Sequence, residues 1–321
     1  MTNILLAENE FGKEAEALLK KHGMVVQYGS HRLFLKNLPY AEVIVTGLEE
    51  KILLPVIRSA RRLRLIGSRT TQLRYIDLDE CRRRGIKVVN IKTGSLVLKN
   101  TPSTAEETMA LILALSRNIP WAFDALKRGK WERRKYGGTE MKGKTLGLIG
   151  FGRLGKLVAG YARAFGVRVC AYDPFVSAVD MRRHGVRKTT LAELLKKSDI
   201  VSVHATYDDS TFGMLTHAHF RLMRPHALFI NTARGEITDE KALLLALKSR
   251  WIRGAAVDTL AGEKPDGSHL SGNPLVAYAR VNENLIILPH LGGATKEATE
   301  KTQNYISVLV VKEIKKMRLT T

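Results

Sequence analysis

The sequence predicts an α/β protein made of two doubly wound domains, each built on a parallel sheet. Short runs rich in Val and Ile alternate with stretches of helical periodicity along most of the chain, and this alternation is typical of parallel sheets covered by helices on both faces. The length of 321 residues favours two domains over one. Several apolar runs end at glycine or at a charged residue, as expected where the strands of an open parallel sheet reach a ligand-binding edge.

Two strand-helix series follow each other along the chain. In the first, strands are expected at residues 4–7, 43–46, 65–66 and 88–91, with helices at 13–22, 52–62 and 78–84. The second starts at residue 145 and runs to about residue 288, with strands at 168–172, 201–204, 228–231 and 255–257. The two series predict two separate sheets.

The segment around Asn100 joins the two series. A long helix is expected to begin near Thr101, where Ser103 and Glu106 have the spacing of a capping box. The last stretch, 295–317, has the pattern of one amphipathic helix that packs back on the first domain. We therefore predict one discontinuous domain, residues 1–100 plus 294–321, and a second domain, residues 101–293.

The chain is strongly basic. Its 52 Lys and Arg residues outnumber its 31 Asp and Glu residues and give a net charge of +21. The stretch 58–87 alone holds ten Lys and Arg against three Asp and Glu. Such an excess attracts nucleic acid, acidic surfaces or anionic substrates. Because the basic residues are spread out, without interleaved aromatics or zinc-ligand spacing, we favour a solvated basic face over nucleic-acid binding.

Cysteine usage and hydropathy indicate the compartment. The two cysteines, Cys81 and Cys170, cannot form a disulfide framework and lack metal-ligand spacing, so no metal site is expected. No apolar run reaches the roughly 18 residues of a membrane span, and the first residues turn acidic too soon for a signal peptide. These features predict a cytoplasmic protein with no membrane partner.

A glycine-rich turn between a strand and a helix is the clearest motif. The apolar run 146–149 leads into Gly150, Gly152 and Gly155, with the spacing Gly-x-Gly-x-x-Gly, and an apolar-periodic helix follows. In such a turn the first glycine permits a tight bend, the second lets the backbone approach a pyrophosphate, and the third lets helix and strand pack closely. The free amides at the helix start favour phosphates. Alone, the spacing also fits a plain tight turn.

An acidic residue strengthens the dinucleotide interpretation. The strand expected at 168–172 ends at Asp173, 18 residues after Gly155. A carboxylate there suits the ribose hydroxyls and repels a 2′-phosphate, although it also fits a strand-end cap. Strand, glycines, helix, strand and acid in this order predict a Rossmann domain with NAD as its cofactor.

Three later segments place polar residues directly after strand-like runs. Residues 229–240, 254–265 and 288–295 contain Arg234, Glu263 and His290 respectively. With the glycine motif, these segments resemble the D-isomer-specific 2-hydroxyacid dehydrogenase family, whose members include phosphoglycerate dehydrogenases, D-lactate dehydrogenases and hydroxypyruvate reductases. The resemblance covers nearly the whole chain. It implies an NAD-dependent oxidoreductase with a Rossmann NAD-binding domain and a smaller, flavodoxin-like substrate domain.

The resemblance assigns a role to each of the three residues. It implies that Arg234 binds the substrate carboxylate, and that Glu263 orients His290, the acid/base. The chemistry is sound without the family. Hydride addition to a ketone leaves an alkoxide that needs a proton, which a histidine can supply and take back. A carboxylate fixes its tautomer, and a guanidinium grips a carboxylate bidentately. Taken singly, each residue also fits an ordinary structural role.

Further contacts with the cofactor are implied by matching positions. Arg153 and Leu154 match residues that line the pyrophosphate, and Thr232 and Asp258 match residues on the nicotinamide side. Ala205 replaces a residue that commonly donates a side-chain hydrogen bond, so that contact is lost. The complete implied set is Thr104, Gly150, Gly152, Arg153, Leu154, Gly155, Asp173, His204, Ala205, Thr232, Ala233, Asp258 and Gly292.

The segment 67–77 matches the family's substrate loop but departs from its usual residues. Gln72 stands where Gly is common, and Arg74 stands where Asp is common. Arg74, aided by Arg69, predicts a preference for hydroxy acids with a second anionic group, while the alternative is that Arg74 points to water. The implied substrate contacts are Thr71, Gln72, Leu73, Arg74 and Asn100.

Two interpretations of the function stay open. In the first, the chain is a dehydrogenase of a small anionic 2-hydroxy or 2-keto acid and forms a homodimer, to which the apolar segment 119–131 contributes. In the second, it is a dinucleotide-sensing, corepressor-like binding protein with vestigial turnover. The altered substrate loop favours the second interpretation, and the intact Arg234, Glu263 and His290 argue against it.

Overall fold

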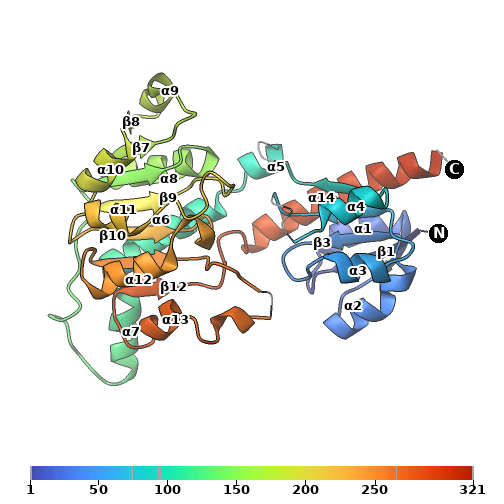
Figure 1. Ribbon diagram of the computed structural model, residues 1–321, viewed down its shortest axis with the longest axis horizontal. Coiled ribbons are helices and arrows are strands. Elements are labelled where there is room, and N and C mark those ends of the chain that lie inside the picture. The colour runs from blue at the N-terminus through green and yellow to red at the C-terminus, as the bar shows by residue number, and fades with distance from the viewer. Residues whose placement is uncertain (1, 72, 74, 93–94, 265, 320–321) are drawn as a thin grey trace. The chain divides into compact units, whose positions relative to one another are not determined.

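The computed structural model describes residues 2–71, 73, 75–92, 95–264 and 266–319 (Figure 1). The chain divides into two compact units. Unit 1 comprises Met1–Thr101 and Thr295–Thr321, and unit 2 comprises Pro102–Ala294. The sequence predicted domain boundaries at 100/101 and 293/294. That the two parts are separate domains, each able to fold by itself, stays a prediction.

Unit 1 is built on a parallel sheet of five strands. The sheet order is β2-β1-β3-β4-β5, and all its pairs are parallel. Alternate residues of the inner strand β1 face opposite sides, with Ile4 and Leu6 in one core cluster and Leu5 and Ala7 in the other. The strands are β1 (Thr2–Ala7), β2 (Gly23–Val26), β3 (Val43–Thr46), β4 (Leu65–Ser68) and β5 (Lys87–Asn90).

Helices cover both faces of this sheet. Phe34, Ile57 and Cys81 pack on one face from three successive helices, and Leu19 packs on the other beside the C-terminal helix α14. The predicted final helix is therefore present, and it packs on the first sheet as expected. The helices of unit 1 are α1 (Lys13–Lys20), α2 (His31–Asn37), α3 (Leu54–Ser59), α4 (Leu78–Arg83), α5 (Leu96–Lys99) and α14 (Lys296–Leu319), with the 3-10 turn η1 (Leu38–Tyr40).

Unit 2 is built on a parallel sheet of seven strands. The order β12-β11-β10-β9-β6-β7-β8 reverses direction between β6 and β9, and in open sheets such a switch point opens a crevice at the carboxyl ends of the strands. The predicted fold class, two doubly wound parallel sheets with a Rossmann-type second unit, is confirmed. The strands are β6 (Thr145–Ile149), β7 (Arg168–Tyr172), β8 (Arg187–Lys188), β9 (Ile200–Val203), β10 (Leu228–Asn231), β11 (Gly254–Val257) and β12 (Leu285–Ile287).

The sheet of unit 2 separates two cores. Leu148 contributes to the core under α6 and α8, while its neighbour Ile149 contributes to the core under α10 and α12. The helices are α6 (Ser103–Ser116), α7 (Ile119–Lys127), α8 (Arg153–Ala164), α9 (Ala178–Arg183), α10 (Leu191–Lys197), α11 (His217–Leu222), α12 (Glu240–Lys248) and α13 (Pro274–Ala279), with the 3-10 turns η2 (Gly235–Ile237) and η3 (Ser268–Leu270).

Two local predictions were wrong. Ser103 is not an N-cap, because α6 starts at Ser103 itself and Pro102 occupies the cap position in an αR conformation. The Ser103 hydroxyl is buried and has no hydrogen-bond partner among the described residues. The helix expected at 52–62 is only Leu54–Ser59, since Ile52 pairs with Ile76 in a parallel bridge and leaves the helix.

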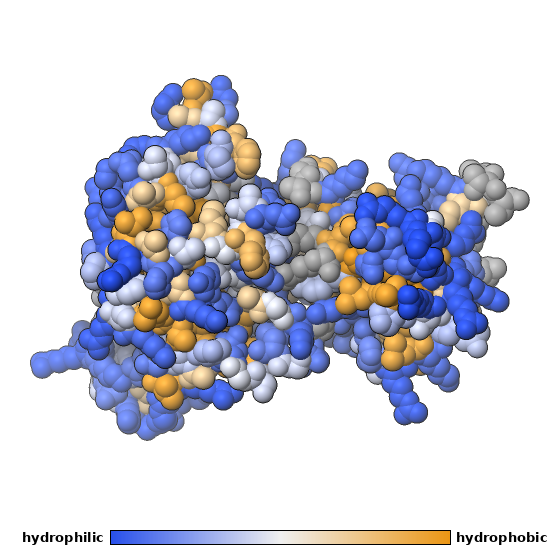
Figure 2. All heavy atoms as spheres, viewed as in Figure 1, coloured by the Kyte–Doolittle hydropathy of each residue, from blue (hydrophilic) through white to orange (hydrophobic). Residues whose placement is uncertain are grey.

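Figure 2 shows hydrophilic side chains spread over the visible face of both units, with smaller apolar areas between them. That distribution agrees with a solvated surface. Within the described part of the chain, no helix has both the length and the apolar character needed to cross a membrane.

Candidate active site

The glycine turn after β6 is held by close backbone contacts. Gly150 has φ +94°, and a Cβ there would lie 2.6 Å from the amide nitrogen of Ala205 and from the carbonyl carbon of His204. A Cβ on Gly155 would lie 2.5 Å from the carbonyl oxygen of Gly150. Both positions therefore exclude a side chain. At Gly152, by contrast, no atom of the described residues outside its chain neighbours lies within 4 Å of the position that a Cβ would take. A ligand can therefore approach the backbone there.

Helix α8 begins at this open face. Its N-cap is Gly152, and no side chain caps it, so amides of the first turn are available to an anion. Arg153 is half-buried, which lowers the pKa of its guanidinium, and Leu154 packs against the core beneath the helix. An open backbone face beside uncapped amides fits the pyrophosphate of a dinucleotide.

Asp173 is fixed at the end of β7. Its Oδ2 accepts a hydrogen bond from the amide of Phe151 at 2.8 Å, and its Oδ1 accepts one from the amide of Phe175 at 2.9 Å. These bonds tie the carboxylate to the glycine turn. Each oxygen keeps acceptor capacity, so Asp173 can also receive the hydroxyls of a ribose.

At the end of β9, His204 is a partly buried, neutral imidazole. Its Nε2 is 2.9 Å from Oγ of Ser202, and burial lowers its pKa to about 4. Its Nδ1 is buried without a hydrogen-bond partner among the described residues. Ala205 follows with a side chain that packs on the core. The unsatisfied nitrogen agrees with the implied contact to a cofactor.

The turn after β10 presents Arg234. Asn231 shapes this turn, because its side chain donates to the carbonyl of Arg234 at 2.9 Å and accepts from the amide of Ala233 at 3.0 Å. Thr232 is buried, with its hydroxyl 2.8 Å from that of Thr108 on α6. The local fold thus holds the backbone of the predicted carboxylate-binding arginine by side-chain hydrogen bonds.

His290 and Glu263 form a direct pair. Nδ1 of His290 lies 2.7 Å from Oε2 of Glu263, while Oε1 of Glu263 accepts from the amide of Leu260 at 2.9 Å. Because a carboxylate can only accept, Nδ1 carries the proton and Nε2 is the nitrogen able to exchange one. His290 has φ +58°, an uncommon conformation for a residue with a side chain, and such strain is frequent at functional sites.

Asp258, at the end of β11, holds the loop that carries His290. Its backbone carbonyl accepts from the amide of His290 at 2.8 Å. Its side chain accepts from the amides of Leu291 at 2.6 Å and Gly292 at 2.9 Å. Thr104, in the first turn of α6, donates to the carbonyl of Gly292 at 2.8 Å. Asp258 is therefore the anchor of the loop as well as an implied cofactor contact.

The predicted residues of unit 2 share one edge of its sheet. The strands are all parallel, so Gly150, Asp173, His204, Thr232 and Asp258 follow their carboxyl ends at the same side. Each of these positions came from the sequence. Glu107 on α6 did not, because nothing in its helical context marks it. Its carboxyl group lies beside Asp258, and burial, reinforced by that charge, raises its pKa to about 8.

The substrate residues implied in unit 1 are less closely defined. Gln72 and Arg74 lie outside the described residues. The backbone carbonyl of Thr71 accepts from the side chain of Asn90 at 3.1 Å, and Leu73 packs on the core of unit 1. Asn100 ends α5, and its carbonyl accepts from Lys301 at 3.2 Å.

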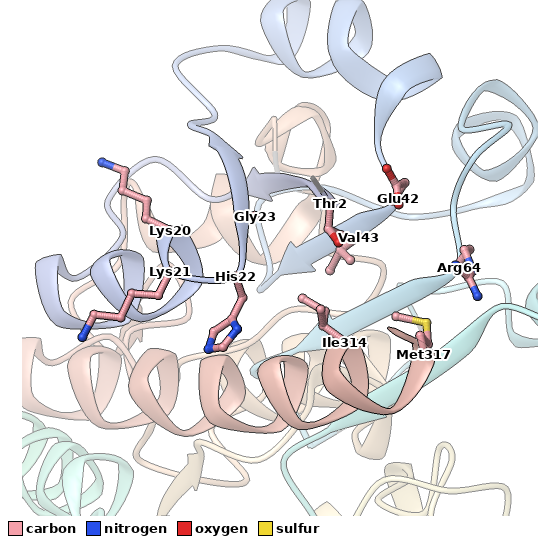
Figure 3. A pocket seen from close by; sticks show the side chains of 10 residues that line it. All are labelled: Thr2, Lys20, Lys21, His22, Gly23, Glu42, Val43, Arg64, Ile314 and Met317. Carbon is pink, nitrogen blue, oxygen red and sulfur yellow. The ribbon is translucent and has the colours of Figure 1, made fainter. Parts of the chain in front are cut away.

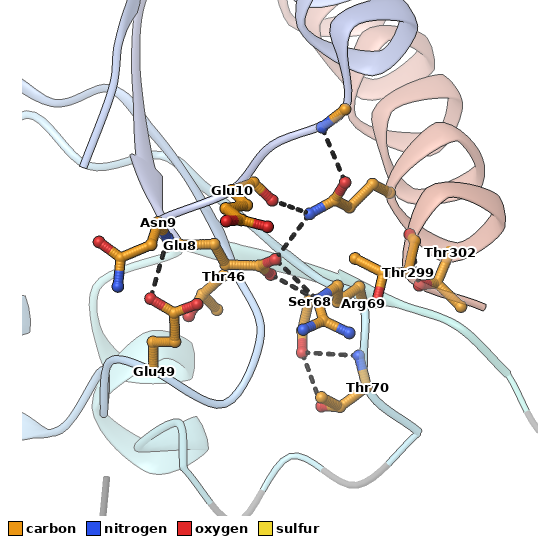
Figure 4. A network of polar contacts seen from close by, with 12 residues as sticks. Glu8, Asn9, Glu10, Thr46, Glu49, Ser68, Arg69, Thr70, Thr299 and Thr302 are labelled. Atoms are coloured by element: carbon orange, nitrogen blue, oxygen red, sulfur yellow. Dashed lines mark hydrogen bonds and ion pairs between the residues drawn. The ribbon is translucent and has the colours of Figure 1, made fainter. Parts of the chain in front are cut away.

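Arg69 is engaged by its own unit (Figure 4). Its Nε lies 2.8 and 2.7 Å from the two oxygens of Glu8, and Gln303 of α14 donates to Glu8 at 3.0 Å. The side chain of Glu8 is only 2% exposed. The expectation that Arg69 adds to a positive field was therefore wrong, since a buried carboxylate balances its charge.

A cavity of about 480 Å³ lies elsewhere in unit 1 (Figure 3). Thr2, Gly23 and Val43 contribute to its lining at the amino ends of the strands, with Ile314 from α14. Of its basic residues, Lys20 pairs with Glu16 at 2.6 Å and points away from the cavity in this view. None of the described substrate residues lines this cavity.

Comparison with known proteins identifies the family. The model of the D-isomer specific 2-hydroxyacid dehydrogenase NAD-binding domain matches residues 109–292. D-3-phosphoglycerate dehydrogenase of Archaeoglobus fulgidus is 35% identical over 317 residues, covering 98% of this chain and 57% of that protein. The enzyme of the same name from Methanocaldococcus jannaschii is 37% identical over 284 residues, covering 88% of this chain and 51% of that protein. The chain thus spans about half the length of these curated relatives.

Among solved structures, a D-lactate dehydrogenase from Aquifex aeolicus, complexed with NAD and lactic acid, is similar throughout. It is 29% identical, with a TM-score of 0.81, and the match covers 98% of this chain and 96% of that one. The family model itself spans more than half of the chain, including the glycine turn, Asp173, Arg234, Glu263 and His290. The chain belongs to the D-isomer specific 2-hydroxyacid dehydrogenase family, and residues 109–292 form its NAD-binding domain.

Proposed function

We propose that this chain is an NAD-dependent dehydrogenase that interconverts a small D-2-hydroxy acid and its 2-keto acid. The observation that carries the proposal is the 2.7 Å contact between Nδ1 of His290 and Glu263, on a loop anchored at the same sheet edge as the glycine turn. A dinucleotide crevice and an oriented imidazole are the two parts that such a reaction requires.

In the proposed reaction, His290 is the acid/base. During reduction of a keto acid, Nε2 gives its proton to the oxygen on C2, and in the reverse direction Nε2 takes that proton back. Glu263 keeps the proton of Nδ1 in place and stabilises the imidazolium before the transfer. Bound NADH supplies the hydride for C2, and the proton from His290 completes the hydroxyl group.

Arg234 is the proposed anchor of the substrate carboxylate. A guanidinium can form two parallel hydrogen bonds with a carboxylate, which fixes the orientation of the adjacent keto carbon. The hydrogen bonds of Asn231 to the turn support this role, because they hold the backbone of Arg234. Thr71, Gln72, Leu73, Arg74 and Asn100 are the proposed substrate contacts from unit 1.

The proposed substrate is a small anionic acid, with phosphorylated or dicarboxylic hydroxy acids as the leading candidates. The similar proteins named above are phosphoglycerate and D-lactate dehydrogenases, and the basic stretch 58–87 favours the more anionic class. Oxidation of NADH in the presence of a panel of 2-keto acids tests the function directly. Turnover with at least one acid is expected, and NADH binding without turnover on a broad panel would refute the proposal.

The alternative, a dinucleotide-sensing corepressor-like protein, predicts binding without chemistry. The oriented His290–Glu263 pair argues against it, because sensing a dinucleotide needs no acid/base. Nucleic-acid binding is a separate possibility for so basic a chain, and it would show as an affinity that falls steeply with salt.

We also propose a cytoplasmic homodimer. The described cysteines, Cys81 and Cys170, are both free, which agrees with a reducing compartment. On the segment proposed for the dimer, Ile119 and Leu126 are each 52% exposed and Phe123 is 62% exposed, and apolar side chains gathered on one helix suit an interface. Trp121 instead packs on the core of unit 2, while Trp131 is largely exposed.

The dimer is tested by light scattering at micromolar concentration. The expected mass is that of two chains, and Phe123→Glu is expected to reduce it to one chain by placing a charge in the apolar interface. A monomeric wild-type protein would contradict the proposal.

A further inference from the structure

The half-buried Glu107 forms a pair with the buried Asp258, and the proposed reaction does not use this pair. A Cβ on Gly292 would lie 2.9 Å from Oε2 of Glu107 and 3.1 Å from Oδ2 of Asp258, so the two carboxyl groups border the same small space. Asp258 is 1% exposed. Oε2 of Glu107 is buried, and no donor among the described residues reaches it.

Two carboxyl groups so placed hold one proton between them. Asp258 already accepts from two backbone amides, those of Leu291 and Gly292, and these bonds stabilise its charged form. Glu107 has no comparable donors at Oε2, so it is the member that keeps the proton. Burial, together with the charge of Asp258, raises the pKa of Glu107 to about 8. Near neutral pH the pair therefore carries a single negative charge.

Among the residues that the structure describes, His290 is a further titratable group that acts on the pair. Burial raises the pKa of Asp258, and a positive charge on His290, on the loop after β12, acts in the opposite direction. On the side of α6, the neighbours Thr104 and Thr108 are uncharged, as is Thr232 after β10. Glu106, next to Glu107 on α6, is exposed. Of these neighbours, Glu107 is the group whose protonation we expect to respond to a new charge near Asp258.

We infer that Glu107 is a proton-linked sensor of the oxidation state of the bound nicotinamide. The inference rests on the proposed function and on the position that the family resemblance implies for Asp258, on the nicotinamide side of the cofactor site. The ring of NAD⁺ carries a positive charge and that of NADH does not. A positive charge beside the pair favours loss of its proton, so NAD⁺ binding should release a proton that NADH binding does not.

The sign of the pH dependence follows from this linkage. Below the pKa of Glu107, NAD⁺ must displace the proton, so its affinity rises with pH, by up to about tenfold per pH unit for one linked proton. Above that pKa, Glu107 has already lost its proton, and the affinity for NAD⁺ no longer rises with pH. NADH affinity shows no such rise, so the preference for NAD⁺ over NADH grows as the pH approaches the pKa from below.

Calorimetry on the full chain measures this linkage without relying on turnover. NAD⁺ and NADH are titrated from about pH 6 to about pH 9 in buffers of different ionisation enthalpy, which reports protons released on binding. We expect up to about one proton per chain with NAD⁺ and none from this pair with NADH. Glu107→Gln should abolish the release assigned to the pair, whereas Glu106→Gln, the matched exposed control, should retain it.

The difference in proton release between the wild type and Glu107→Gln measures the contribution of Glu107. Equal proton release with both dinucleotides, or unchanged release in Glu107→Gln, would overturn the inference. The wild-type comparison alone decides it if the variant does not fold. Failure of either dinucleotide to bind, with no keto acid reduced, would refute the proposed function itself. If the dinucleotides bind and a keto acid is reduced, but NAD⁺ binding releases no more protons than NADH binding, only the role of Glu107 is refuted.

Discussion

In each unit a carboxylate in a loop after a strand pairs with a basic side chain. The surroundings of the two pairs differ. In unit 1, Glu8 follows β1 and is 2% exposed, and its partner Arg69 is 19% exposed. Gln303 adds a third contact to Glu8. It lies on α14, the helix that packs on one face of the sheet of unit 1. In unit 2, Glu263 and His290 are 14% and 21% exposed and lie on loops. The first pair is enclosed by its own unit, while the second keeps a ring nitrogen able to exchange protons.

The comparison teaches that position at a strand end does not by itself make a functional group. Glu8 accepts hydrogen bonds from Arg69 (Figure 4) and from Gln303, so donors within unit 1 occupy its oxygens. Glu263 uses one oxygen for a local amide and the other for His290. Removing one member of a buried ion pair is costly to the fold, whereas a half-buried pair that includes a histidine can perform proton transfer.

The largest effect is expected from breaking the pair of unit 2 at His290. His290→Asn should lower kcat/KM by roughly 10²–10⁴, the usual contribution of a general acid/base. Asn is chosen because it tolerates the positive φ at this position. NAD⁺ affinity and the melting temperature should change little, since Asp258 anchors the loop through backbone amides. Steady-state kinetics measure the effect, and a variant that retains most of its activity would contradict the role.

Breaking the pair of unit 1 should act on stability instead. Glu8→Gln removes the charge that balances Arg69 in a largely buried site, at a cost of roughly 3 kcal/mol in the free energy of unfolding. Denaturant unfolding measures this change. Glu10→Gln serves as the control, because the side chain of Glu10 is exposed. If both variants unfold alike, the Glu8–Arg69 pair does not stabilise unit 1.

A smaller effect is expected at Asp173. Asp173→Asn keeps an oxygen for the amide of Phe151 but removes the charge that repels a 2′-phosphate. The preference for NAD over NADP should narrow by about 1.5–3 kcal/mol, or roughly tenfold to a hundredfold in the ratio of kcat/KM. Asp173→Ala should narrow it as well. Comparable efficiency with both cofactors in the wild type would refute the proposed selectivity.

The smallest effect is expected at Arg74, which lies outside the described residues. Because Glu8 balances Arg69, any additional positive field from this loop falls to Arg74. Arg74→Ala should lower kcat/KM for a dianionic keto acid by about tenfold more than for a monoanionic one, and less so as salt is raised. Equal slowing of both substrates, or of neither, would show that Arg74 does not select the substrate.

Much of the architecture could be predicted because its signals are local. The strands 43–46, 168–172 and 228–231 match β3, β7 and β10 residue for residue, since buried parallel strands are continuous apolar runs. The edge strand β2 was missed, because the short apolar run 23–26 directly follows the helix expected at 13–22 and periodicity alone does not separate the two. The capping box failed because Pro102 competes for the cap position, a choice that the spacing of Ser103 and Glu106 does not reveal.

The sequence by itself determined the class of the fold, the glycine turn and the three residues of the proposed chemistry, because each depends on residue types at short, fixed spacings. The tertiary structure decided which charged groups meet. It placed Glu8 against Arg69 and Glu107 against Asp258, partners that lie on different elements and share no local pattern. Such contacts form when parallel strands bring their carboxyl ends to one edge of the sheet and a helix packs over them. Burial and the distance to the partner, and not residue type alone, then determine whether each group is charged.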